Sequence, residues 1–296
     1  MELNQLTFHE QPELRQPDLV IAFAGWSDAA QAATGTLAYL VRRLDAKRFA
    51  EIKAEEFYDF SSLRPMVTVD RGLITSLKMP QSSFFCWQNQ TSNHDLVLLH
   101  GIEPQLHWQR FVGLILDLAD RLKVHRIYAL GGLYDRIPHT REPRISGLVN
   151  EPSLMDVLEK HNIEPIVYQG PSSLHALLMT ESVQRKTEVI SLWGHCPFYV
   201  RAESNPMVCL ALLRKLTQLL EIQIDVEELK KSGEYLQQML SRLLAENDEL
   251  RQYVKKLEEQ YDLEGTAPAE LLEDANRIVK EVEDFLRSER HKPETS

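Results

Sequence analysis

The chain has 296 residues, of which 43% are hydrophobic and 26% charged, and its formal net charge at pH 7 is −11. This composition is typical of a folded protein with a sizeable core, and it excludes a wholly disordered chain. No apolar run approaches the roughly 20 residues that cross a bilayer, and an acidic chain lacks the positive surface that binds a phosphate backbone. We therefore expect neither a membrane nor a nucleic acid as a partner.

The first residues show no signal peptide, because a basic stretch followed by an apolar one is missing. Three cysteines, Cys86, Cys196 and Cys209, are too few and too scattered for a disulfide framework. These two features predict a cytoplasmic protein.

Short apolar runs alternate with amphipathic stretches over the first two thirds of the chain. In chain order we expect a strand at 18–26, a helix at 27–44, a strand at 51–60, a hairpin-like pair at 71–80 and 82–90, a strand at 95–101, a helix at 106–124 and a strand at 126–133. Then come a polar loop at 131–147, a helix at 153–163, a strand at 165–170, a helix at 172–185, a strand at 188–194 and a helix at 206–222. This alternation predicts an α/β fold with a mainly parallel sheet between layers of helices.

The character of the sequence changes near residue 223. Residues 223–296 hold 11 Lys and Arg against 19 Asp and Glu, a net charge of −8, which leaves −3 of the total −11 for residues 1–222. Leucines recur seven apart at 229, 236, 243, 250 and 257, and Asn247 occupies a heptad position where asparagine can fix register. A break at 264–268 separates the two helices we expect, at about 225–262 and 268–288.

We accordingly expect an α/β core at 1–222 and an acidic helical extension at 223–296. The extension has two interpretations: a helical hairpin whose second apolar stripe covers the first or packs on the core, or a parallel zipper between two chains. Gly233 in the middle of the seam favours the hairpin, as do extra apolar residues that widen the stripe beyond a two-helix seam.

Common catalytic and cofactor motifs are missing from the sequence. It has no G-x-S-x-G, no G-x-x-x-x-G-K-[ST], no G-x-G-x-x-G after the first strand and no H-E-x-x-H. The spacing of His94, His100 and His107 matches no common metal-binding pattern. His195 and Cys196 are neighbours on a predicted strand, so they point to opposite faces and do not form a nucleophile–base pair. We expect no cofactor, no metal and no assigned catalytic residue, and we expect Cys196 to be a buried structural residue.

Polar residues and glycines gather where three predicted strands end. In an open α/β sheet, ligands bind at the carboxyl ends of the strands. The candidate ligand-binding residues in these three stretches are Gly25, Trp26, Asp28, Gly131, Gly132, Asp135, Pro138, His139, Thr140, Arg141, Trp193 and His195. Each has a structural alternative: Asp28 as a helix cap, the loop arginines as solvated charges and His139 as a turn residue.

Five stretches together resemble the proteasome assembly chaperone 2 (PAC2) family in its prokaryotic branch. They are "VIAFAGWSDAAQAATGTLAYL", "GGLYDRIPHTREP", "YQGPSSLHALLM", "SLWGHCPFYVRAESNPMVCLALLRKL" and the C-terminal "LRQYVKKLEEQYD…VEDFLR". The resemblance implies an α/β/α sandwich similar to nucleoside phosphorylases, and non-enzymatic chaperones of proteasome α-rings among the eukaryotic members. Where many members read Pro-His-Tyr, this chain has Pro197-Phe198-Tyr199, so no role for that histidine is expected.

Two functions remain open at this point. The first is a non-catalytic interaction protein that forms homo-oligomers and holds a protein client. The second is a binder or enzyme for a small ligand such as a nucleoside or an anionic, phosphorylated compound. In the second, Arg136, Arg141 or Arg144 would hold the anion, Asp28 would accept from a hydroxyl and His139 would act as acid or base.

Overall fold

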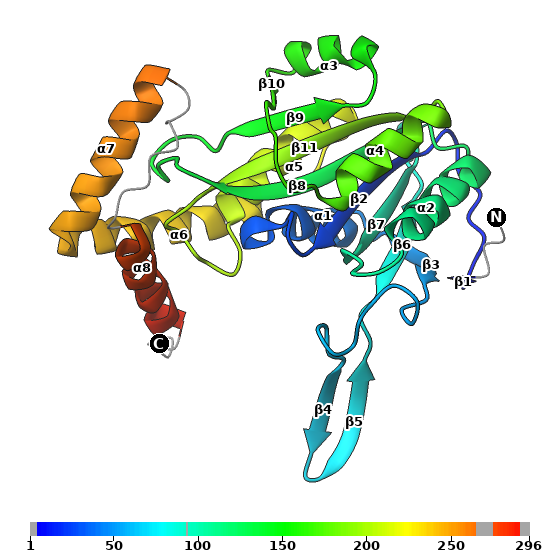
Figure 1. The fold of residues 1–296 in the computed structure, drawn as a ribbon, viewed down its shortest axis with the longest axis horizontal. Coiled ribbons are helices and arrows are strands. Elements are labelled where there is room, and N and C mark those ends of the chain that lie inside the picture. The colour runs from blue at the N-terminus through cyan, green and yellow to red at the C-terminus, as the bar shows by residue number, and fades with distance from the viewer. Residues whose placement is uncertain (1–4, 93, 265–274, 291–296) are drawn as a thin grey trace.

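The computed structural model describes residues 5–92, 94–264 and 275–290 and has a three-layer α/β/α architecture, as predicted (Figure 1). Within these residues the central sheet has nine strands in the order β1-β3-β6-β7-β2-β8-β11-β9-β10. The strands are β1 (Leu6–Phe8), β2 (Asp18–Ala24), β3 (Lys47–Ile52), β6 (Ser82–Trp87), β7 (Leu96–Ile102), β8 (Arg126–Asp135), β9 (Ile145–Val149), β10 (Glu164–Pro165) and β11 (Glu188–Pro197).

The four central strands β7, β2, β8 and β11 run parallel, whereas β1, β3 and β6 on one side and β9 on the other pair antiparallel. The sequences of the four central strands are almost continuously apolar, because helices cover both faces of the sheet. Among the described residues, no helix is both long enough and apolar enough to span a membrane.

Two pairs of helices cover the sheet. On one face lie α1 (Ala32–Arg43), preceded by the short 3₁₀ turn η1 (Ala29–Gln31), and α5 (Pro206–Leu219). The other face is covered by α2 (Trp108–Leu122) and α4 (Leu174–Gln184). A 3₁₀ turn, η2 (Pro152–Leu154), and the short α3 (Met155–Lys160) lie beside β10. The strand β2 thus lies in the sheet, and α1, the helix that follows it, lies in the layer against one face of that sheet.

Several predicted strands differ from those observed. The strand expected at 51–60 lies at Lys47–Ile52, because Phe57 and Tyr58, which are 0% and 2% exposed, turn into the core instead of continuing the sheet. The strand expected at 165–170 is reduced to Glu164–Pro165. Conversely, β8 and β11 extend past their expected ends, so residues 131–135 belong to a strand and the polar connection spans only 136–144.

The expected pairing of 71–80 with 82–90 is wrong. β5 (Leu73–Lys78) pairs with β4 (Met66–Asp70) in a separate two-stranded sheet, and β6 joins the main sheet between β3 and β7. We call residues 66–78 the β4–β5 arm. It projects away from the three layers into solvent (Figure 1).

The helix expected at 225–262 is wrong, because the structure has α6 (Glu227–Glu246) and α7 (Asp248–Glu264) there. Asn247 separates them: its backbone is extended, with φ −129° and ψ 101°, and its Oδ1 accepts from the Leu250 backbone N–H at 2.9 Å. Asn247 is therefore a helix N-cap rather than a heptad residue that fixes register. Its Nδ2 also donates to Glu281 Oε2 at 2.8 Å, on α8 (Ala275–Arg290).

The C-terminal helices share one apolar cluster with the segment that follows β11. This cluster holds Leu236, Leu240 and Leu243 from α6, Leu250, Tyr253, Val254 and Leu257 from α7, Ile278, Val282 and Leu286 from α8, and Tyr199, Val200 and Ala202. The break expected at 264–268 and the start of the helix expected at 268–288 lie largely outside the described residues. Gly233 lets α6 approach α5, because a Cβ there would lie 2.3 Å from Met207 Sδ.

Candidate functional site

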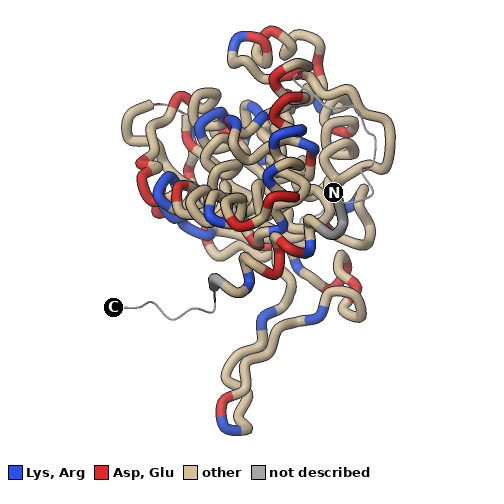
Figure 2. Tube along the Cα trace, turned by 90° about the vertical axis from the view of Figure 1, so that its left-hand side faces the viewer, with Lys and Arg blue, Asp and Glu red and all other residues tan. Residues whose placement is uncertain are grey.

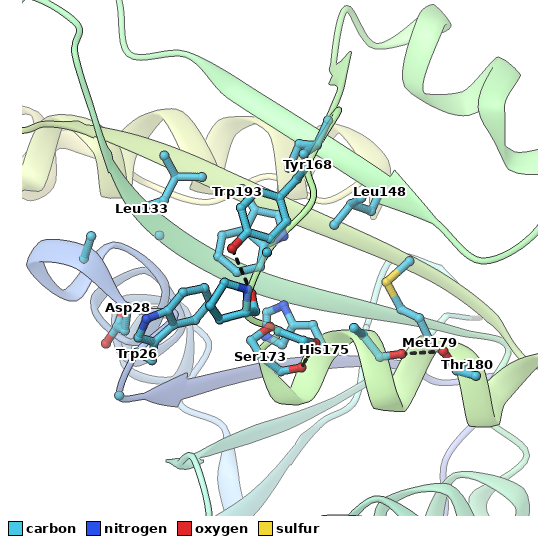
Figure 3. Close-up of a pocket in the computed structure, with 18 of the residues that line it drawn as sticks. Trp26, Asp28, Leu133, Leu148, Tyr168, Ser173, His175, Met179, Thr180 and Trp193 are labelled. Carbon is cyan, nitrogen blue, oxygen red and sulfur yellow. Dashed lines mark hydrogen bonds between the residues drawn. The ribbon is translucent and has the colours of Figure 1, made fainter. Parts of the chain in front are cut away.

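A large pocket opens where the parallel strands β2, β8 and β11 end. Its volume is about 1310 Å³, and five of the predicted residues line it: Gly25, Trp26, Asp28, Gly132 and Trp193. The loop at 166–173 and the first turns of α4 complete it (Figure 3). The prediction of a cleft at the carboxyl ends of the strands therefore matches the position of this pocket.

The floor of the pocket depends on a contact between glycine and tryptophan. A Cβ on Gly131 would lie 2.7 Å from Trp193 Cδ2, so only glycine lets the indole pack flat on β8. The Trp193 Nε1–H donates to Ser191 Oγ at 2.9 Å, and Ser191 Oγ lies 3.1 Å from His175 Nδ1. Ser191 and His175 did not stand out in the sequence. Their positions on β11 and α4 bring them together only in the fold.

Asp28 lies at the pocket but acts as a helix cap. Its Oδ1 accepts from the backbone N–H groups of Ala33 and Thr34 at 2.8 and 3.1 Å, and its Oδ2 accepts from the Thr34 hydroxyl. Burial raises the pKa of Asp28, and these hydrogen bonds oppose that shift. Because both carboxylate oxygens serve the start of α1, the structural alternative describes Asp28 better than a role as acceptor for a ligand hydroxyl.

A second group of predicted residues lies away from this pocket, under α7. The Tyr199 hydroxyl accepts from the His139 backbone N–H at 2.8 Å and lies 2.5 Å from His139 Nδ1. Burial lowers the pKa of His139 to about 4, so the imidazole is neutral at pH 7. The Tyr199 ring packs edge-on against Tyr253 of α7, with 5.7 Å between ring centroids.

Thr140 and Arg141 bind α7 directly. The Thr140 hydroxyl donates to Glu258, and Arg141 pairs with Asp262 at 2.7 Å and with Glu258 at 3.1 Å. The Arg144 guanidinium lies 5.1 Å from the ring centre of Tyr261. The 136–144 connection therefore holds a helix of its own chain, and we call these contacts the α7 clasp. Pro138 lies beside His139 and Arg141 in a narrow space of about 20 Å³.

Asp135 and His195 form a chain of hydrogen bonds with Ser146, a residue that the sequence did not bring to notice. His195 Nδ1 lies 2.7 Å from Asp135 Oδ2, and His195 Nε2 lies 2.7 Å from Ser146 Oγ. Burial acts to raise the pKa of Asp135, but the hydrogen bond and charge of His195 outweigh it and the pKa lies below its usual value. The order serine, histidine, carboxylate is that of a nucleophile, its base and an orienting acid.

A nucleophile must be reachable, and Ser146 is not. Its exposed fraction is 4%, and it does not line the large pocket. Each of the three residues lies on a different strand, β9, β11 and β8. The geometry thus supports a link that fixes the register of three strands rather than an acyl-transfer site. Cys196 points the other way, with Sγ 3.3 Å from the Ala29 carbonyl oxygen, and is fully buried as expected.

One side-chain cluster in the described part of the chain could hold a metal ion. Asp18, His94 and His125 offer three ligand atoms within 4.8 Å of one another, and His125 Nδ1 lies 3.2 Å from Asp18 Oδ1. Two imidazoles and a carboxylate suit zinc. Of the three histidines considered from the sequence, only His94 belongs to this cluster, which lies at the opposite end of β2 from the pocket.

A profile of the PAC2 family matches residues 22–244. A PAC2 family protein from Streptomyces avermitilis has 33% sequence identity, covers 80% of this chain and 99% of its own, and has a TM-score of 0.73. A proteasome-assembly chaperone homologue from Mycobacterium tuberculosis has 28% identity over 80% of this chain and 99% of its own, with a TM-score of 0.73.

An archaeal proteasome activator from Pyrococcus furiosus shares the fold at 19% identity, with a TM-score of 0.65 over 80% of this chain and 97% of its own. A comparison with curated proteins gave no match. The family profile covers well over half of the sequence, and a solved member shares a third of its residues. The chain belongs to the PAC2 family.

Proposed function

We propose that this PAC2 protein is a non-catalytic, chaperone-like protein that works as a homo-oligomer and binds a protein partner. The family and its proteasome-assembly chaperone homologue support a chaperone-like role. The observation that carries the oligomer is the β4–β5 arm. None of the predicted ligand-binding residues lies on the arm. The arm exposes apolar side chains of the kind that are buried in interfaces between proteins.

One face of the β4–β5 arm is apolar and open to solvent. Val67 pairs with Leu77 and Val69 with Ile74. Val67 and Val69 are two residues apart on β4 and so share a face, and a shift in register between the two pairs places Ile74 rather than Thr75 opposite Val69. These four side chains are 51%, 63%, 55% and 66% exposed, in that order. Figure 2 shows charged residues at the tip and base of the arm and none between them.

An isolated two-stranded hairpin is marginally stable in water. Covering a half-exposed Val, Leu or Ile would contribute about 1 kcal/mol per side chain, so one arm face would contribute about 4 kcal/mol to an association. A second copy of the chain supplies an equivalent apolar face, and symmetric pairing of identical surfaces is the commonest route to a homodimer. The arm therefore favours self-association.

The test is the molar mass in solution, measured by light scattering and sedimentation over a range of protein concentrations. We expect the wild-type protein to be a dimer or larger and Leu77→Asp to shift it to the monomer. Thr68→Asp is the matched control, because Thr68 pairs with Ser76 on the opposite face and carries the same added charge. A monomeric wild type, or equal effects of the two variants, would contradict the proposal.

The partner is proposed from the relative rather than from the arm. Because the Mycobacterium tuberculosis relative is a proteasome-assembly chaperone homologue, unassembled proteasome α-type subunits are the first partners to test. We expect purified protein to co-elute with such subunits in size-exclusion chromatography and not with finished particles. Failure to co-elute with any α-type subunit would reject this class of partner while leaving the oligomer measurement unaffected.

A further inference from the structure

The large pocket at the strand ends carries an inference that goes beyond the proposed chaperone role. Three aromatic side chains, Trp26, Tyr168 and Trp193, lie together at one side of it, and Leu148 and Met179 lie on the other (Figure 3). Trp26 and Tyr168 are 61% and 62% exposed, which is unusual for side chains of this size, whereas Trp193 is buried. Such a site offers flat apolar surfaces to a planar molecule.

The pocket also holds a buried polar atom without a partner. His175 lines the pocket and is 1% exposed, and within the described residues its Nε2 has no hydrogen-bond partner. Its other nitrogen, Nδ1, lies 3.1 Å from Ser191 Oγ. Ser191 Oγ already accepts the Trp193 indole N–H, which can only donate. The Ser191 proton is therefore free to be donated to His175 Nδ1.

This arrangement fixes the state of His175. Burial lowers its pKa to about 4, so the ring is neutral at pH 7 and carries one proton. With Nδ1 accepting from Ser191, that proton lies on Nε2. A buried N–H without an acceptor is unfavourable by about 1–3 kcal/mol. A ligand that places an oxygen or ring nitrogen near Nε2 would remove this cost.

The charged residues around the pocket narrow the class of ligand further. No lysine or arginine is found among the described residues that line it, and its one carboxylate, Asp28, is engaged at the start of α1. None of the three arginines expected to hold an anion, Arg136, Arg141 and Arg144, lines the pocket, and Arg141 pairs with α7 instead. A phosphorylated or carboxylated ligand would lose its hydration without gaining a counter-charge. The pocket therefore suits an uncharged ligand.

We propose that this pocket binds an uncharged, planar, mainly apolar carbonyl compound, which stacks on the tryptophans and accepts a hydrogen bond from His175 Nε2. Its volume of about 1310 Å³ leaves room for a molecule of drug size or larger. The site is independent of the β4–β5 arm, so its failure would not affect the oligomer proposal.

The experiment titrates full-length protein with three small probes and follows tryptophan fluorescence and calorimetric heat. Coumarin is planar, neutral and carries a carbonyl oxygen; naphthalene lacks the acceptor; coumarin-3-carboxylate adds a negative charge. We expect saturable binding of coumarin, at least tenfold tighter than binding of either other probe. Flavone and its carboxylated derivative repeat the comparison with a larger ring system.

Two variants locate the site. His175→Phe keeps a flat ring but removes the donor, so coumarin should bind no more tightly than naphthalene while naphthalene binding is kept. Ala176→Trp adds a large side chain to an exposed position on the pocket wall and should abolish binding of all probes. The proposal is overturned if no neutral probe binds below about 1 mM, if the carboxylates bind equally well, or if His175→Phe leaves the preference for coumarin unchanged.

Discussion

His139 makes the stability of this protein depend on pH in a way that one substitution can isolate. His139 is part of the 136–144 connection and is half-buried; its Nδ1 lies against the Tyr199 hydroxyl and its Nε2 is shielded from solvent. An unfolded histidine titrates near pH 6.5, whereas burial lowers the pKa of folded His139 to about 4. The unfolded chain therefore takes up the proton first as the pH falls.

The direction and size of the effect follow from this difference. Because the folded-state pKa is depressed, the contribution of His139 to stability is fully present above about pH 6.5 and is lost as the pH falls toward 4. With these two pKa values, lowering the pH from 7 to 5 costs about 2 kcal/mol of unfolding free energy per histidine. His175, whose pKa burial also lowers to about 4, adds a loss of similar size.

The assay is urea unfolding at pH 7 and pH 5, at one protein concentration because oligomers gain stability with concentration. His139→Asn keeps an acceptor near the Nδ1 position and cannot titrate. We expect wild type to lose about 2 kcal/mol more than His139→Asn between the two pH values, since all other groups are shared. Equal losses in the two proteins would refute a buried, neutral His139.

Three further predictions concern packing and the α7 clasp. Gly131→Ala would push a Cβ to 2.7 Å from the Trp193 ring, so we expect a loss of about 1–3 kcal/mol in urea unfolding and a changed tryptophan emission. Asn247→Ala removes the cap of α7 and should cost about 1 kcal/mol, whereas Asn247→Ser, which keeps a capping oxygen and adds no charge beside Glu281, should cost less. Arg141→Ala removes the exposed pairs with Asp262 and Glu258. It should speed protease cleavage within α7 at low salt and lose this effect at high salt, where such pairs are screened.

The central sheet could be predicted because its signals are local. β2, β7, β8 and β11 are apolar runs that the sequence shows directly, and α1, α2 and α5 carry clear helical periodicity. The arm was missed although its signal was present: alternating residues flank Arg71-Gly72, and both have positive φ, as a tight hairpin turn requires. The expected partner for β5 was wrong because β6 pairs with β3 along one edge and with β7 along the other, which no local pattern reveals.

The residues of the site divide in the same way, into those with a local signal in the sequence and those without one. Trp26 and Trp193 were found because each is next to a glycine near the end of an apolar run, and parallel neighbours bring such ends together. Ser191, His175 and Ser146 were missed, since their roles depend on contacts between elements distant in sequence. The break at Asn247 could have been found from Asn-Asp-Glu, a capping residue followed by acids in the first helical turn.

The polar 136–144 connection has the composition of a ligand-binding loop but binds a helix of its own chain. Its histidine, threonine and arginine have the chemistry of an anion site, and the acids that meet it, Glu258 and Asp262, belong to the acidic C-terminal helices. The loop and the helix are complementary in charge, which their separation in sequence conceals. Arg141 belongs to the clasp and does not line the pocket, and this favours a neutral ligand over the phosphorylated one.

The roles of the arm and of the pocket can be tested separately because different elements of the fold form them. The pocket is formed by the ends of β2, β8 and β11 with α4, whereas the arm emerges between β3 and β6, which β7 separates from β2 in the sheet (Figure 1). Leu77→Asp should therefore dissociate the oligomer without changing the affinity for coumarin, and Ala176→Trp should do the reverse. Should either variant change both properties, ligand binding and assembly would be thermodynamically linked, and coumarin would then have to shift the monomer–oligomer equilibrium by the same factor by which assembly shifts its own affinity.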